Sequence, residues 1–176
     1  MRDIFKYSAA VSRQNNRSPE LAAILPKVIA AKLENIAARA VTTNGSVVSF
    51  HGRASRSVPR SKRFVTNWNL LHIIARGAMQ VTDNFPEISV SYWLGVPKTL
   101  FYQTAVLSVV MGIGLGIFSF IAQSSIGFSL LLALGTALGS LAFFLIAFTL
   151  YFMLTIIRFN LFIKYCMNVA EKQLRQ

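Results

Sequence analysis

A long stretch without charges constrains this chain more than any other feature of its sequence. Residues 99–157 contain no Asp, Glu, Lys or Arg. As a single helix at about 1.5 Å per residue, the stretch would extend roughly 90 Å, about three times the ~30 Å hydrocarbon core of a bilayer. One crossing would leave most of the stretch unused, and three would leave no residues for turns. The stretch therefore predicts two membrane-spanning helices joined by a short loop.

The loop falls where small and polar residues gather, in "AQSSIGFS" at 122–129. We therefore expect spans at about 99–122 and 127–157, within a transmembrane helical hairpin over 98–157. The alternative is a buried hairpin in the core of a soluble protein, which so long an uncharged stretch disfavours.

Each expected span carries two glycines four residues apart, a spacing that lets helix backbones approach closely in lipid. The pairs are Gly112 with Gly116, and Gly135 with Gly139. We expect them to pack the two spans on each other. An interface with another subunit is the alternative.

The charges of the chain lie on both sides of the hairpin and are mostly basic, with 18 Lys and Arg against 6 Asp and Glu. Lys and Arg near span ends favour the cytoplasmic side, and two crossings return the chain to the side it left. We therefore expect both termini on the cytoplasmic side of a bacterial inner membrane or an organelle inner membrane. The single cysteine, Cys166, fits a reducing compartment.

The part before the hairpin predicts a small cytoplasmic α+β domain over 18–97, preceded by a basic N-terminal arm at 1–17. Ser18 and Pro19 open a segment with apolar residues at helical spacing, which predicts a helix to about residue 40 that "TTNG" ends at Gly45. Three or four antiparallel strands follow, at about 48–50, 64–74, 78–83 and 87–94. The helix would cover the apolar face of this sheet.

The part after the hairpin, residues 158–176, predicts a basic amphipathic C-terminal helix. Its apolar residues keep a helical period, and such a helix docks on a membrane surface or on a partner. Aromatic and basic side chains beside the spans are typical of the membrane interface, and four fit this position: Tyr92, Trp93, Lys98 and Arg158.

A cluster of five basic residues without an acid lies in "HGRASRSVPRSKRF", residues 51–64: Arg53, Arg56, Arg60, Lys62 and Arg63. We expect this segment to set the membrane topology and to attract anionic lipids. Contact with an acidic partner subunit is the second interpretation. Nucleic acid is disfavoured, because stacking aromatics are not interleaved with the cations and no recognition helix is apparent.

Candidate catalytic residues are few. His51 and His72 have no second His or Cys at metal-ligand spacing, and the spans lack the buried acid or base of an ion relay. We therefore expect neither enzymatic activity nor a metal or cofactor. The leading hypothesis is a non-catalytic accessory or structural subunit of a larger membrane protein complex, with other membrane subunits and anionic lipids as partners. The alternatives are a self-assembling membrane-perturbing effector with a ligand-sensing soluble domain, and an anionic-lipid-binding membrane adaptor.

Overall fold

The computed structural model describes residues 4–14, 18–36, 38–52, 73–122 and 125–175. The chain divides into two compact units. The first unit joins the residues up to Pro97 with Thr155–Gln176, so it is built from both sides of the uncharged stretch. The second unit is Lys98–Leu154. The five basic residues of the 53–63 segment lie outside the described residues.

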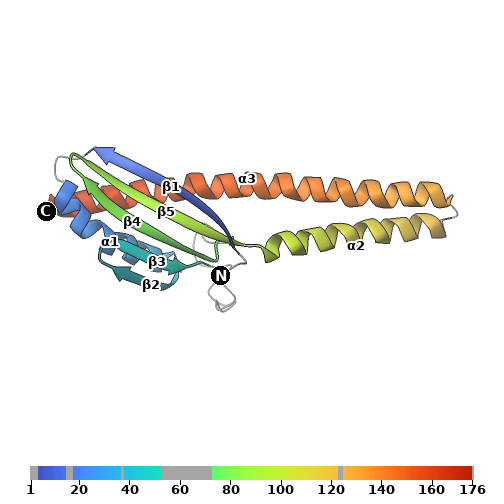
Figure 1. Ribbon diagram of the computed structural model, residues 1–176, viewed down its shortest axis with the longest axis horizontal. Helices are drawn as coiled ribbons and strands as arrows, with labels where there is room; N and C mark the ends of the chain where they lie inside the picture. Colours follow the sequence, from blue (N-terminus) through green and yellow to red (C-terminus); the bar gives the residue numbers. More distant parts are fainter. Residues whose placement is uncertain (1–3, 15–17, 37, 53–72, 123–124, 176) are drawn as a thin grey trace. The chain divides into compact units, whose positions relative to one another are not determined.

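The first unit holds a five-stranded antiparallel sheet in the order β1-β5-β4-β3-β2, shown in Figure 1. The strands are β1 (Ile4–Gln14), β2 (Arg39–Asn44), β3 (Val47–His51), β4 (Arg76–Asn84) and β5 (Glu87–Pro97). The α+β class and the antiparallel sheet are thus confirmed, whereas the described residues form five strands instead of the predicted three or four. The strand expected at 64–74 falls almost wholly outside the described residues.

Strand β1 occupies the segment that was expected to be an irregular basic arm. It pairs with β5 along its whole length, from Ile4 beside Pro97 to Gln14 beside Glu87. The pairing has a clear physical basis, because every second residue of β1 from Phe5 to Val11 is aromatic, alanine or valine, and the residues between them are Lys, Ser or Ala. This is the period of a strand with one covered face.

Strand β2 is formed by residues that were expected to end the first helix. Helix α1 (Ser18–Asn35) ends earlier than predicted, and the chain turns back into β2 four residues later. Gly45 does take a positive φ of 56°, but it does so in the turn between β2 and β3. The polar "TTNG" segment therefore ends a strand instead of a helix.

One face of the sheet is covered by α1 and by the end of α3 (Ile126–Leu174). Helix α1 packs mainly on β2, β3 and β4. The α3 segment from Thr155 onward buries an apolar stripe at helical spacing: Phe159, Phe162, Ile163, Cys166, Met167 and Ala170. The predicted amphipathic helix is therefore present, and its apolar side packs in the core of the first unit.

The second unit is a helical hairpin made of α2 (Thr99–Ile121) and the first part of α3. Among the described residues, two helices are long and apolar enough to cross a membrane, namely Tyr102–Ile121 of α2 and Ile126–Leu174 of α3. Helix α3 does not end where the uncharged stretch ends. It continues unbroken to Leu174, so one helix contributes to both units.

Candidate functional site

The hairpin is closed by a seam of small residues. On α2 the seam consists of Ser108, Gly112, Gly116 and Ser119, and all four are buried. A Cβ added at Gly112 would lie 2.7 Å from both the carbonyl oxygen of Ala133 and the Cβ of Ala137, and one added at Gly116 would lie 2.8 Å from the Cβ of Ala133. The two backbones are in such close contact that only glycine fits at these two positions.

Polar side chains inside the seam are also paired. Ser119 and Ser129 are both buried, and their hydroxyl oxygens lie 3.4 Å apart. The Ser108 hydroxyl donates to the backbone carbonyl of Thr104 at 3.0 Å. Such bonds satisfy polar groups where water is absent, so they stabilise the closed hairpin instead of lining a pore.

The other predicted glycine pair does not belong to this seam. A Cβ added at Gly135 or Gly139 would have no atom within 4 Å. These two glycines lie two residues beyond Ala133 and Ala137, which is about 200° around the helix from the side that contacts α2. The sequence analysis expected all four glycines to pack the spans on each other, with an interface to another subunit as the alternative, and the structure packs only Gly112 and Gly116 between the two helices.

The contact between the sheet and α3 centres on Phe159. Its ring stacks on Phe50 with centroids 6.1 Å apart, and the ring of Tyr92 lies 5.1 Å away. Gly77 makes room for this stack, because a Cβ there would lie 2.6 Å from the ring of Phe50. The Tyr92 hydroxyl donates to Oδ1 of Asn160 at 2.6 Å, and burial raises the pKa of Tyr92 to about 12, with a further contribution from Tyr7.

A second group of contacts fastens β1 to the last turns of α3. Arg13 donates to the side chain of Asn168 and forms a 3.2 Å ion pair with Glu171. Glu171 also pairs with Arg175 at 2.9 Å. Between these contacts and Phe159 lies Cys166, whose pKa burial raises to about 12 although the charge of Lys32 acts in the opposite direction. A raised pKa makes this thiol unreactive.

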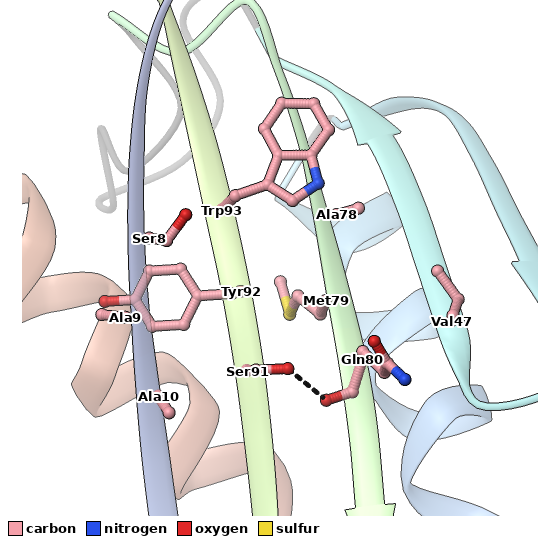
Figure 2. Close-up of a pocket in the computed structure, with 10 residues that line it drawn as sticks. All are labelled: Ser8, Ala9, Ala10, Val47, Ala78, Met79, Gln80, Ser91, Tyr92 and Trp93. Carbon is pink, nitrogen blue, oxygen red and sulfur yellow. Dashed lines mark hydrogen bonds between the residues drawn. The ribbon is translucent and has the colours of Figure 1, made fainter.

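The opposite face of the sheet carries no helix among the described residues and has a shallow depression of about 510 Å³. Figure 2 shows the indole of Trp93 lying over this face between Ser8 and Ala78, with Ser91 and Gln80 beyond it. The Nζ atom of Lys6 lies 5.3 Å from the centre of the indole ring. Around Trp93, this face therefore combines small polar side chains with an aromatic ring and the ammonium group of Lys6.

The four residues predicted for the membrane interface lie in different environments. Tyr92 is buried in the core with 3% of its surface exposed, so its ring is not available to head groups. Trp93 lies on the uncovered face of the sheet, partly exposed. Lys98 is the residue before α2, and Arg158 is exposed on α3. The interface role stays a prediction for these last three residues.

Within the part of the chain that the structure describes, no three His, Cys, Asp or Glu side chains are close enough to hold a metal ion. Comparison of the chain with models of protein families, with curated proteins and with solved structures finds no match in any of the three. Two surfaces of the described residues are open to a partner or a ligand: the side of α3 that carries Gly135 and Gly139, and the uncovered face of the sheet.

Proposed function

We propose that this chain is a non-catalytic accessory subunit of a larger membrane protein complex, held in the bilayer by the α2–α3 hairpin. The observation that carries the proposal is the open position of Gly135 and Gly139 on α3. A glycine inside a helix costs roughly 1 kcal/mol relative to alanine. A transmembrane helix of a partner that packs closely on this side would offset the cost, because small residues four apart allow such an approach.

The outer surface of the hairpin supports insertion in a bilayer. Large apolar side chains are exposed along both helices, among them Ile113, Phe118, Leu131 and Phe143, each with more than half of its surface accessible. A helix in the core of a soluble protein buries most of its side chains, and soluble proteins rarely expose apolar patches beyond a few hundred Å². Lipid chains would cover this surface at no cost.

The first unit is built from the chain segments before and after the hairpin, which fits a hairpin that enters and leaves the membrane on one side. Residues before Lys98 and residues after Leu154 share one compact unit and one hydrophobic core. Such a core needs both ends of the hairpin on the same side of the bilayer, as an even number of crossings provides. The basic residues flanking the hairpin favour the cytoplasmic side for this unit.

The proposal is tested by extraction of the full chain from its native membrane in a mild detergent, followed by size-exclusion chromatography and mass spectrometry. We expect the chain to elute with a second membrane protein in a fixed ratio. Gly135→Leu with Gly139→Leu should abolish this co-elution. The matched control is Gly114→Leu with Gly127→Leu, since those glycines are also open but lie on different helices, and it should retain the partner.

Elution as a single chain in its micelle would contradict the accessory role. Elution with further copies of itself alone would instead favour the self-assembling effector, and dye leakage from liposomes carrying the chain would then distinguish a membrane-perturbing assembly from an inert one. Leakage that Gly135→Leu relieves is the result expected of the effector.

A further inference from the structure

A row of basic residues crosses the whole sheet at one end of its uncovered face. In the strand register Lys6 pairs with Gly95, Gly95 with Arg76, Arg76 with His51, and His51 with Arg39. Directly paired residues in an antiparallel sheet lie on the same face. One position from each strand therefore forms a line of three permanent cations, one histidine and one glycine, which we call the basic row. At about 4.8 Å between strands, the row is roughly 19 Å long.

The rest of this face carries no comparable charge among the described residues. The neighbouring row contains Ser8, Trp93, Ala78 and Ser49, and the next contains Ala10, Ser91, Gln80 and Val47. Among the described residues of the strands, the acidic residue on this face is Glu87 at the far end, where it pairs with Gln14 and with Asn84. Asp83 pairs with the buried Ile88 and lies on the covered face. The sheet is thus basic at one end and weakly acidic at the other.

The basic row lies at the end of the sheet from which the chain enters the hairpin. Gly95 is four residues before Thr99, where α2 begins, and four residues reach at most roughly 14 Å. Backbone hydrogen bonds continue the sheet at this end: the Ala75 N–H donates to the carbonyl of Gly95 at 2.8 Å, and the Gly52 N–H donates to the carbonyl of Ala75 at 2.9 Å. If α2 enters a bilayer, the row cannot be far from its head groups.

We propose that the basic row binds the phosphate groups of anionic phospholipids in the same bilayer that holds α2, and so docks the uncovered face of the sheet toward the membrane surface. Its length suits several head groups side by side, and the contact must be close, because the field of an anionic surface fades over roughly 10 Å. Trp93 lies beside Lys6 in the adjacent row, and an indole ring favours the lipid interface.

This inference rests on the membrane anchoring in the proposed function, but not on the accessory role, since it concerns lipid and not a protein partner. It also assigns the contact to residues other than the Arg53–Arg63 segment. Gly52 and Ile73, the described residues on either side of that segment in the chain, are close in sequence to His51 and Arg76 of the basic row, so the two sets of cations must be separated by experiment.

The chain itself offers a reporter. It has two tryptophans, and Trp68→Phe leaves Trp93 as the only one. The full-length chain is placed in nanodiscs that contain a phospholipid with a nitroxide on its head group, with or without anionic phospholipid, at low and at high salt. Quenching of Trp93, expressed relative to matched discs without nitroxide, measures how close the uncovered face lies to the head groups.

Three variants are compared with the parent. Lys6→Gln with Arg76→Gln removes two cations of the row, and Lys27→Gln with Lys172→Gln removes two exposed cations from α1 and α3 as the control of equal charge. The third variant changes all five basic residues of the 53–63 segment to Gln. The reactivity of the Cys166 thiol is measured without denaturant in each variant. We expect it to be very low, which verifies that the first unit is folded.

We expect quenching in the parent to rise with anionic lipid and to fall at high salt. The row variant should lower the ratio of docked to undocked sheet about 25-fold, because each of the two removed cations contributes roughly a factor of five near an anionic surface. The charge control and the five-residue variant should keep the response of the parent.

Parent-like quenching in the row variant would overturn the proposal, as would loss of the response in the five-residue variant alone. Two results together would assign the row to nucleic acid instead: quenching of Trp93 that is the same with and without anionic lipid, and a decrease of this quenching when a short single-stranded RNA is added. Failure of the chain to enter nanodiscs at all would contradict membrane insertion.

Discussion

The small-residue seam allows a prediction in which two equivalent pairs of substitutions act in opposite directions. The change is Gly→Ala at Gly112 and Gly116 in one variant, and at Gly135 and Gly139 in the other. An added methyl group at the first two positions would lie 2.7 and 2.8 Å from its nearest neighbours across the seam. Carbon atoms prefer about 3.5–4.0 Å, so the helices must part by about 1 Å.

The expected magnitudes follow from two opposing terms. Forcing an extra methyl group into a packed contact costs typically about 1–3 kcal/mol, whereas alanine gains about 1 kcal/mol over glycine in a helix. The seam variant should therefore lose roughly 2 kcal/mol in total. The outward variant meets no atom within 4 Å, so it keeps only the gain, up to roughly 2 kcal/mol.

The assay is an SDS titration of the full chain in mixed micelles, read by disulfide formation between Ser119→Cys and Ser129→Cys in a Cys166→Ala background. The two hydroxyl oxygens lie 3.4 Å apart, so a closed hairpin brings the new sulfurs close enough to bond. The seam variant should lose the crosslink at lower SDS than the parent, and the outward variant at equal or higher SDS. Equal shifts of the two variants in the same direction would refute the assignment of faces.

Three further predictions concern the first unit. Phe159→Ala should cost about 3–5 kcal/mol of unfolding free energy by chemical denaturation followed by circular dichroism, whereas an unchanged midpoint would contradict the stack on Phe50. Tyr92→Phe should cost about 1 kcal/mol at neutral pH. Because the Tyr92 pKa rises from 10.0 to about 12 on folding, the unfolded state ionises first and the parent should lose stability between those pH values, while the Phe variant should lose less, as pH-dependent denaturation would reveal. Cys166, with its pKa raised from 9.0 to about 12, should hold roughly 1,000-fold less thiolate than in the unfolded chain, so iodoacetamide labelling at pH 8 should be very slow until denaturant is added.

The hairpin was predictable because its signal is the complete absence of charge, which does not depend on how the chain packs. The roles of its glycines were not. Helix α3 carries two small-residue stripes, Ser129–Ala133–Ala137 and Gly135–Gly139, and both have the spacing that permits close packing. Only the rotation of the helix decides which stripe meets α2, and that rotation results from contacts along the whole seam.

The sheet was predictable where one strand alternates cleanly, as β5 does, and less so at its edges. Strand β1 has lysine, arginine and serine among its apolar residues, so its basic composition concealed a period of two. Tyr92 was assigned to the membrane interface because it precedes the span, but the alternation of β5 turns its ring into the core. The basic row could not be found in the sequence, because it takes one residue from each strand and exists only through the register.

The division of the first unit between the two ends of the chain also determines when it can form. A ribosome releases the sheet and α1 first, then the apolar hairpin, and only afterwards Phe159 and the rest of the α3 stripe that completes the core. Until those last residues emerge, Phe50, Tyr92 and their neighbours lack their cover, a state that is prone to aggregation. In the membrane arrangement that we propose, the whole hairpin therefore leaves the ribosome before the sheet can complete its folding, and a stop codon placed shortly after the hairpin would leave a chain without a stable first unit.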